Sequence, residues 1–407
     1  MLNRRNLIKR LSAIPLLGGL VSNPVTSALA SASQTAAKRD LFKELGVRTF
    51  INGRGTITFM TGSLMRDETL AAINSSSQDF CMLDELQDKV GEKIAQMVHA
   101  EAAVVTSGAF AALTLGTAGV LTGTDPKKVE QLPHLAYTGM KSEIIIQKAH
   151  QIHYNHALLN TGCKLVFVET PEDIEKAINE RTAQMHFLNS FAPKGKIKQE
   201  EWVALGKKHN IPTSLDMAAD VPPVENLWKY NDMGFSFVVV SGGKAIRGPQ
   251  SAGILMGKKE IIAAARLHMP PRGATIGRGM KVNKEEILGL YVALEKYIHL
   301  DHEKEWKMWE TQVAHIENAV KNIKGITTTV VVPPLADHTP TLRIAWNKNI
   351  VNITTQELEE KLRNRNPSIE VNGTGPTTIE VAPWMMLPGQ ERIVAARLKE
   401  EFSKMLS

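Results

Sequence analysis

Cysteine is scarce in this sequence, because the 407 residues include only Cys81 and Cys163. Two thiols cannot define a disulfide framework, so a small disulfide-stapled scaffold is excluded. One bridge between the two remains open, but neither stands in a CxxC or metal-ligand spacing. We expect both to be small buried apolar groups.

An excess of charge of one sign is also lacking. The chain is 43% apolar and 22% charged, which is ordinary for a globular protein with a large core and two lobes, and which excludes a disordered chain. The net charge is +6, but residues 1–30 hold four basic residues and no acidic one, so the remainder carries only +2. This is too little to indicate nucleic acid binding, and we expect none.

Long uninterrupted apolar runs are missing as well. Arg4 and Arg5 precede a run over 11–21 that proline and glycine interrupt, and residues 28–30 (Ala-Leu-Ala) supply a small-x-small cleavage pattern. The run is too short and broken for a comfortable membrane span, so we expect no stable one. Residues 3–9 resemble a twin-arginine export signal.

We therefore expect residues 1–30 to be a twin-arginine-type signal peptide that directs the protein to the periplasm through the twin-arginine export machinery. An uncleaved anchor or a fraying tail is the alternative. Twin-arginine export carries folded proteins, so a cofactor would be inserted before export.

Strand and helix signals alternate for more than 200 residues after a polar connector. Apolar strands are expected at 103–105, 143–147, 164–168, 184–188, 211–215 and 235–240. Continuous apolar strands separated by helices predict an α/β fold with a mainly parallel sheet that is covered on both faces.

The pattern changes at residue 284. A long helix is expected there, continuing in charged form toward Val313. It is followed by strands at 327–332, 341–346 and 369–371 and by a closing helix at 391–406. These elements predict a second, smaller α+β domain.

Lys244 lies just past the buried strand 235–240, after Gly242 and Gly243, which allow another group to approach the backbone closely. The carboxyl ends of strands are where α/β sheets bind ligands. A partly desolvated lysine there is suited to bond covalently to a carbonyl compound, because its pKa falls. Taken alone, such a lysine is more often a solvated loop residue.

Asp216 ends another apolar strand and precedes Lys244 by 28 residues, about one strand–helix–strand step. A carboxylate beside a pyridine nitrogen keeps that nitrogen protonated and makes the ring an electron sink. Aspartate and lysine on successive strand ends are what pyridoxal phosphate needs. For Asp216 alone, a helix N-cap is an equally good interpretation.

A third element lies between a strand and an Ala-rich helix: Thr106, Ser107, Gly108 and Ala109. Free backbone N–H groups and the helix dipole favour a phosphate at such a place. By itself the segment is more often a simple capping turn. The three elements together, in this order along one sheet, favour pyridoxal phosphate.

Residues 241–253 (SGGKAIRGPQSAG) resemble the lysine segment of fold-type I pyridoxal-phosphate enzymes. They are most similar to the branch related to bacterial selenocysteine synthase (L-seryl-tRNA selenium transferase), which includes D-glucosaminate-6-phosphate ammonia-lyase. Segments 50–56, 62–65, 83–91, 216–223 and 276–282 fit the same branch. The resemblance covers roughly residues 40–300 and is weak across the C-terminal domain.

The resemblance implies the fold-type I fold, with a large domain built on a mainly parallel seven-stranded sheet. It implies an N-terminal segment over 31–80 that reaches the active site, a large cofactor-binding domain over 81–283 and the small α+β domain over 284–407.

The resemblance also implies roles for single residues. Lys244 would carry the cofactor and move protons at the substrate α-carbon, and Asp216 would pair with the pyridinium nitrogen. The expected cofactor contacts are Thr106, Ser107, Gly108 and Ala109 on the phosphate with Ser241 as a further contact, His150 stacked over the ring, and Asn189 on the phenolic oxygen. Gln250 lies in a loop that reaches the neighbouring subunit's phosphate in related dimers, so a homodimer or higher homo-oligomer is expected.

Two further sets of residues have competing interpretations. His150, His153 and His156 could form a metal cluster, but spacings of three turn each side chain about 60° further round a helix. No acidic or cysteine ligand lies beside them either, and we expect no metal. Arg54, Arg278 and Arg343 are candidates to hold a substrate carboxylate or phosphate. Each taken singly is more often a surface ion-pair partner.

The expected reaction is carbon–nitrogen (ammonia) lysis by α,β-elimination on a small-molecule amino acid or amino-sugar acid. This expectation comes from the ammonia-lyase branch and not from any residue that demands elimination. An aminotransferase or an amino-acid racemase is the alternative. Selenium transfer is disfavoured by the low charge, the export signal and the short sequence before Phe50, and a non-catalytic periplasmic binding protein is least favoured.

Overall fold

The computed structural model describes residues 39–406. The chain divides into two units, residues 1–49 and 50–407, and the described part of the first contains helix α3 (Leu41–Glu44). The expected signal peptide at 1–30 lies outside the described residues. Within 39–406, no helix is long and apolar enough to cross a membrane.

A seven-stranded sheet forms the centre of the large domain, in the order β2-β8-β7-β6-β5-β3-β4. Its strands are β2 (Ala102–Thr106), β3 (Glu143–Gln147), β4 (Lys164–Val168), β5 (Thr182–Leu188), β6 (Thr213–Asp216), β7 (Phe237–Ser241) and β8 (Gly253–Gly257). Strands β4, β3, β5, β6 and β7 run parallel, and β8 is antiparallel to both of its neighbours. The mainly parallel seven-stranded sheet is confirmed, although β8 was not among the expected strands.

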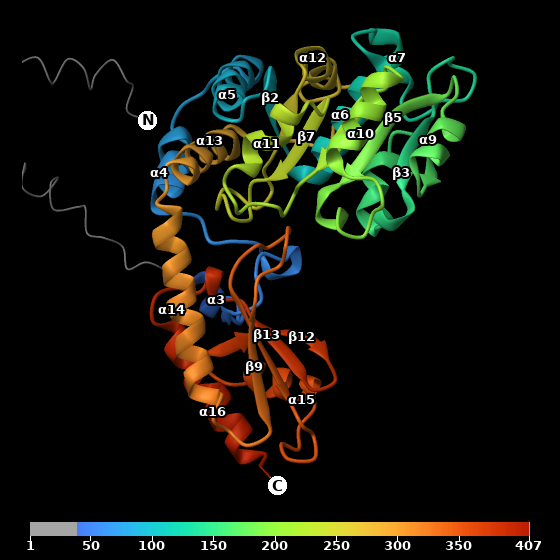
Figure 1. Cartoon of the computed structure of the whole chain (residues 1–407). Helices are drawn as coiled ribbons and strands as arrows, with labels where there is room; N and C mark the ends of the chain where they lie inside the picture. The colour runs from blue at the N-terminus through green and yellow to red at the C-terminus, as the bar shows by residue number, and fades with distance from the viewer. Residues whose placement is uncertain (1–38, 407) are drawn as a thin grey trace, which may run out of the picture. The chain divides into compact units, whose positions relative to one another are not determined.

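Helices cover both faces of this sheet (Figure 1). The helices of the large domain are α4 (Asp67–Ser76), α5 (Leu83–Met97), α6 (Gly108–Thr122), α7 (Pro126–Gln131), α8 (His156–Leu159), α9 (Pro171–Ala177), α10 (Gln199–Lys208), α11 (Asn226–Met233), α12 (Lys259–Leu267) and α13 (Lys284–Ile298). Every residue of β5 is buried. Neighbouring residues of one strand, Ile144 and Ile145, belong to separate apolar clusters, which explains why the strands are apolar on both sides.

The expected long helix over 284–313 is wrong, because the chain breaks into two helices there. Helix α13 ends at Ile298, and the Asp301 carboxylate accepts a hydrogen bond from the backbone N–H of Lys304, which caps α14 (His302–Val320). Such an N-cap satisfies an amide that would otherwise lack a partner and begins a new helix.

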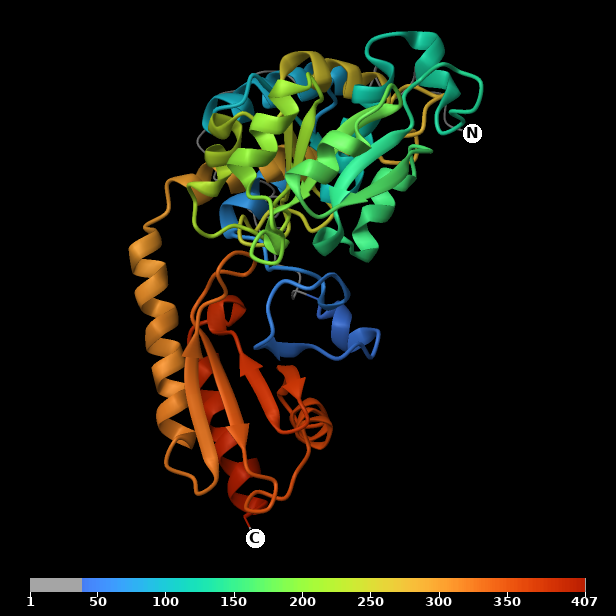
Figure 2. The same ribbon diagram turned by 45° about the vertical axis from the view of Figure 1, so that its right-hand side comes forward.

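The small domain packs α14 and α16 (Gln390–Lys404) against an antiparallel sheet of order β12-β13-β10-β9 (Figure 2). Its other elements are β9 (Ile326–Val331), β10 (Thr341–Trp346), α15 (Thr355–Arg363), β11 (Ser368–Glu370), β12 (Asn372–Gly375) and β13 (Thr378–Val381). Strand β11 pairs in parallel with β1 (Phe50–Asn52), and Ile51 joins the apolar core of this domain. The start of the second unit therefore belongs structurally to the small domain.

The two cysteines differ in environment. Cys163 is buried, as expected, and burial raises the pKa of its thiol to about 11. Cys81 is exposed, so its expected burial is wrong. It lies in the turn between α4 and α5, next to the exposed Phe80 and Met82.

Candidate active site

Asp216 and the Lys244 turn meet at one edge of the large sheet. Strands β6 and β7 are parallel neighbours, with Asp216 paired to Val239, so both strands end at the same edge. Asp216 is 7% exposed, and its Oδ1 accepts a hydrogen bond of 2.9 Å from the Ala218 N–H. Burial raises the pKa of Asp216, whereas this hydrogen bond and the positive charge of Lys244 lower it. The two residues therefore interact electrostatically.

The turn that carries Lys244 needs glycine at its start. A Cβ on Gly243 would lie 2.3 Å from the Cα of Gln250, which is closer than real contacts allow. The Arg247 N–H donates to the Lys244 carbonyl at 2.9 Å, and Arg247 itself has the left-handed φ of 57°. Its guanidinium donates to the carbonyl of Trp384 in the small domain at 3.0 Å. The turn is thus fixed from both domains.

The segment before α4 lies across this turn. The Ser63 N–H donates to the Gly243 carbonyl at 3.2 Å, and the Gln250 amide donates to the Thr58 carbonyl at 2.9 Å. A Cβ on Gly62, which has a φ of +71°, would approach the Gly243 oxygen to 2.7 Å. Residues 58–63 therefore contact the backbone beside Lys244.

The N-terminus of α6 lies on the same sheet edge. In the register of the sheet, Gly253 of β8 pairs with Thr106 on one side and with Ser241 on the other. Helix α6 begins directly after Ser107, whose side chain makes no capping bond within the described structure, and Gly108 has a φ of +85°. Thr106, Ser241 and the first turn of α6 are therefore brought together, with backbone N–H groups available for an anion.

A buried carboxyl that the sequence analysis did not single out lies four residues beyond Asp216. Asp220 is 1% exposed, its Oδ2 accepts a hydrogen bond of 2.8 Å from the Asn189 amide, and its Oδ1 has no partner among residues 39–406. Burial raises the pKa of Asp220 to about 7, and the negative charge of Asp216 acts in the same direction. The sequence feature that could have pointed to Asp220 is its position within the segment 216–223, which resembles the same enzyme branch as the Lys244 segment.

Comparisons with known proteins identify the family of this fold and site. The family model described as "SelA: L-seryl-tRNA selenium transferase" matches residues 92–332, more than half of the chain. The chain belongs to the L-seryl-tRNA selenium transferase (SelA) family. The resemblance that the sequence motifs indicated is thereby confirmed.

The chain is 26% identical over 374 residues to the D-glucosaminate-6-phosphate ammonia lyase of Salmonella typhimurium, a match that covers 89% of this chain and 97% of the relative. A solved structure of D-glucosaminate-6-phosphate ammonia-lyase matches with a TM-score of 0.79 and 25% identity, over 90% of this chain and 99% of that one. The fold-type I fold is confirmed.

Two further relatives carry other activities. A 5'-C-glycyluridine monooxygenase-decarboxylase of Streptomyces is 25% identical and covers 88% of this chain and 91% of its own length. The L-seryl-tRNA(Sec) selenium transferase of Mannheimia succiniciproducens is 30% identical, but the match covers only 40% of each chain. The names of these relatives thus cover lyase, monooxygenase-decarboxylase and transferase activities.

Asn189 has a different environment from the one expected. It is fully buried, and its Nδ2 donates to both Asp220 and the Tyr230 hydroxyl at 2.8 Å each, while its Oδ1 accepts from Gln199 at 2.8 Å. An amide engaged on both sides has no capacity left for a cofactor oxygen. The structure therefore gives Asn189 the role of orienting Asp220.

His150 is packed in the core in the described structure. It has no exposed surface, its ring meets Phe187 edge-on at 4.6 Å, and its Nδ1 accepts a hydrogen bond of 3.2 Å from the Leu188 N–H. Burial lowers its pKa to about 4, so the ring is neutral near pH 7. Stacking on a cofactor would require the ring to leave this packing, and that role stays a prediction. His153 and His156 are exposed, and residues 39–406 contain no group of three potential metal ligands.

The three candidate arginines have different surroundings. Arg54 is half-buried, its Nε has no hydrogen-bond partner in the described part of the chain, and its guanidinium lies 5.3 Å from the Phe59 ring centre. Arg278 is exposed on the loop after α12. Arg343 is ion-paired with Glu380 at 2.7 Å on the neighbouring strand β13. Its guanidinium is already occupied, so the structure does not support its expected role with substrate.

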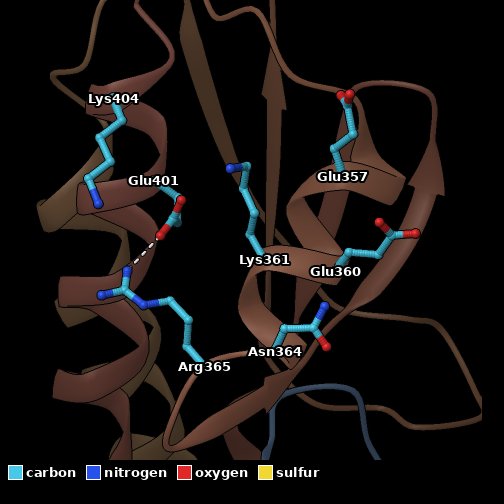
Figure 3. A pocket seen from close by; sticks show the side chains of 7 residues that line it. All are labelled: Glu357, Glu360, Lys361, Asn364, Arg365, Glu401 and Lys404. Carbon is cyan, nitrogen blue, oxygen red and sulfur yellow. Dashed lines mark hydrogen bonds and ion pairs between the residues drawn. The ribbon is translucent and has the colours of Figure 1, made fainter.

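A hollow in the small domain is separate from these residues (Figure 3). It has a volume of about 560 Å³ and is lined by Glu357, Glu360, Lys361, Asn364, Arg365, Glu401 and Lys404. Arg365 pairs with Glu401 at 2.7 Å, and Lys404 pairs with Glu400 at 2.6 Å. Arg365 and Lys404 thus already have acidic partners, and none of the residues that line the hollow forms a lysine–aspartate pair like that at the sheet edge.

Proposed function

We propose that this chain is a pyridoxal-phosphate-dependent carbon–nitrogen lyase that releases ammonia from a β-hydroxy amino acid or amino-sugar acid. The observation that carries the proposal is the meeting of Lys244, Asp216 and the N-terminus of α6 at one sheet edge. Similarity to D-glucosaminate-6-phosphate ammonia lyase over nearly the whole length of that protein supports the reaction type.

The residues at this edge fit pyridoxal phosphate. A Cβ on Gly253 would lie 2.5 Å from the carbonyl carbon of Gly108 and 2.7 Å from the Ala109 nitrogen, so β8 leaves room for the first turn of α6 only because residue 253 is glycine. Helix α6 has 15 residues, and its dipole favours a phosphate. The cofactor's phosphate would be held there, with Ser241 beside it.

Pyridoxal phosphate, when bound, supplies an electron sink that weakens the bonds at the α-carbon of an amino acid. Asp216 would hold the proton on the pyridine nitrogen, because its burial strengthens the attraction between a carboxylate and a cation. Lys244 would take the proton from the substrate α-carbon. Arg54, which has an unpaired Nε, would bind an acidic group of the substrate.

The cofactor is tested by absorbance spectra of the purified protein before and after borohydride reduction, followed by peptide mapping. We expect a visible band that disappears on reduction, with the pyridoxyl adduct on the peptide that contains Lys244. Lys244→Ala should remove the band, whereas Lys93→Ala, which truncates an exposed lysine of α5, should keep it. A protein that stays colourless with added pyridoxal phosphate would refute the proposal.

The reaction is tested by measuring ammonia and 2-keto acid release from D-glucosaminate-6-phosphate, D-glucosaminate and both enantiomers of serine. Release of the two products in equal amounts supports the lyase. Turnover that depends on an added keto acid would identify an aminotransferase instead, and inversion of the substrate without ammonia a racemase. Selenium transfer is disfavoured by the charge of only +2 after residue 30.

For the location of the protein, we propose export to the periplasm, supported by the pattern of Arg4, Arg5 and residues 28–30. The double variant Arg4→Lys/Arg5→Lys should remain in the cytoplasm. Unchanged periplasmic delivery of this variant would rule out the twin-arginine route.

For assembly, we propose a homodimer. Residues 59–82 expose four large apolar side chains, Phe59, Leu64, Phe80 and Met82, each more than 60% accessible in the single chain. Large apolar side chains that are exposed in a single chain are enriched at protein interfaces. Light scattering coupled to size-exclusion chromatography should give twice the monomer mass, and a monomer would contradict the proposal.

A further inference from the structure

The loop over 332–340, between β9 and β10, links the small domain to the segment that carries both buried carboxyls (Figure 2). The backbone N–H of Asp337 donates a hydrogen bond of 3.0 Å to the carbonyl of Ala219. Ala219 stands between Asp216 and Asp220 in the sequence. Asp337 is therefore fixed beside the candidate active site although it comes from the other domain.

The backbone at Asp337 has an uncommon conformation. Its φ is 52°, in the left-handed region that aspartate and asparagine tolerate better than most residues. The loop around it is fixed by the next residues: the His338 ring hydrogen-bonds to the Pro333 carbonyl at 2.6 Å and lies 5.6 Å from Trp306 of α14. Such outliers persist where the surroundings determine them, and they concentrate at functional sites.

The carboxylate of Asp337 interacts with Lys244. Partial desolvation raises the pKa of Asp337, and the positive charge of Lys244 acts in the opposite direction. Asp337 also contributes to the raised pKa of Asp220. The described structure provides no hydrogen-bond donor or cation in direct contact with its side chain, so the carboxyl is not committed to another group.

Accessibility separates Asp337 from the other two carboxyls around Lys244. Asp216 and Asp220 are 7% and 1% exposed, whereas Asp337 is exposed. Asp216 and Asp220 are thus too enclosed to meet a bulky substrate group. Asp337 is the one of these three that a substrate can reach.

Elimination needs two proton transfers at different atoms. A base takes the proton from the α-carbon, and an acid gives a proton to the departing oxygen, because hydroxide is a poor leaving group. A positioned acid contributes about 10²- to 10⁴-fold to such a step. Lys244 serves the α-carbon in the proposed function, which leaves the second proton without a donor.

We propose that Asp337 is the acid that protonates the leaving β-oxygen of the substrate. The β-carbon–oxygen bond breaks with its electron pair on oxygen, and the Asp337 proton completes a water molecule. The α-carbon–hydrogen bond breaks with its proton on Lys244, and its electron pair forms the new carbon–carbon double bond. Asp337 then regains a proton from solvent. This inference rests on the proposed lyase function and names the residue that the elimination requires.

The test compares two leaving groups in three proteins. Asp337→Asn keeps the size and the backbone preference of the residue but removes the acid, and Glu303→Gln removes an exposed carboxylate from α14 as a matched control. The substrates are the β-hydroxy compound that the wild type turns over fastest and β-chloroalanine of the same configuration. Chloride leaves without a proton, so only the β-hydroxy substrate needs the acid.

We expect Asp337→Asn to lose about 10²- to 10⁴-fold in kcat/KM with the β-hydroxy substrate and less than about tenfold with β-chloroalanine. Exchange of the substrate α-hydrogen with deuterated water should persist, and Glu303→Gln should match the wild type. Equal losses on both substrates, or no loss on either, would overturn the acid role. If the wild type releases ammonia from neither substrate, the lyase proposal itself fails.

A second readout needs neither cofactor nor turnover. A carbodiimide joins a carboxyl and an amine that side-chain motion can bring together, so treatment of the full cofactor-free chain should join the Asp337 peptide to the Lys244 peptide. Mass spectrometry should detect this linked pair in the wild type and in Glu303→Gln, but not in Asp337→Asn. Absence of the link from the wild type would contradict the proximity on which the inference depends.

Discussion

Asp220 is the group whose environment makes the sharpest quantitative prediction. Its carboxyl is 1% exposed, with Oδ1 unbonded in the described structure, and burial raises its pKa from the ordinary 3.8 to about 7. Between these two pH values, the folded chain holds a proton that the unfolded chain has released. The free energy of unfolding therefore falls as the pH rises through this window and is constant above it.

The magnitude follows from the two pKa values. A pKa difference of one corresponds to about 1.4 kcal/mol, so the whole window corresponds to about 4 kcal/mol and the part between about pH 5 and pH 8 to about 3 kcal/mol. Asp220→Asn replaces the carboxyl with an amide of the same shape that does not titrate. The variant gains an unpaired N–H₂ group, but this cost does not depend on pH.

The assay is urea unfolding of the cofactor-free wild type and of Asp220→Asn at several pH values. We expect the stability of the variant relative to the wild type to rise by about 3 kcal/mol from about pH 5 to about pH 8. For Asp79→Asn, which changes an exposed aspartate, the free energy of unfolding should depend on pH in the same way as for the wild type. Parallel profiles for Asp220→Asn as well would refute the raised pKa and the reasoning from burial.

Three further predictions concern the cofactor and the substrate. Asp216→Asn should keep the absorbance of bound pyridoxal phosphate but lower kcat by about 10²-fold or more, because a neutral amide stabilises a protonated ring nitrogen poorly. An unchanged kcat would exclude the pairing of Asp216 with the ring nitrogen. Gly253→Ala should weaken pyridoxal-phosphate binding at least tenfold in a fluorescence titration, because its Cβ would displace the first turn of α6, whereas Gly273→Ala, with open space around its Cβ, should not. Arg54→Gln should raise KM for an acidic substrate, whereas Arg343→Gln should leave KM unchanged because that arginine is held in an exposed ion pair.

The sequence was informative wherever the chemistry is encoded by neighbouring residues. A strand followed by two glycines and Lys244, and a strand that ends in Asp216, both place their functional group at a strand terminus. The rules of parallel sheets then bring the two termini together, as the pairing of β6 with β7 does. The same logic located the N-terminus of α6, because a strand–Gly–helix junction is local.

Features that depend on pairing between distant segments were not predictable in this way. The cross-strand register that places Arg343 opposite Glu380 involves residues 37 apart, and it turns a candidate substrate ligand into a surface ion pair. Strand β1 pairs with β11, more than 300 residues later in the chain. The burial of His150 follows from its contact with Phe187 on β5, which its own neighbours do not reveal.

Asp337 shows what this limit means for function. Nothing in the residues around it resembles a catalytic motif, because a lone aspartate between prolines is typical of a surface turn. Its importance comes from the hydrogen bond between its backbone N–H and the Ala219 carbonyl, which holds Asp337 of the small domain against the large domain. In the proposed function, the large domain supplies Lys244, which takes the α-carbon proton, and Asp216, which pairs with the ring nitrogen of a cofactor that many reactions share. A group from the small domain then determines which bond at the β-carbon breaks. Changes in the loop over 332–340 can therefore alter the reaction while Lys244 and Asp216 at the sheet edge stay the same.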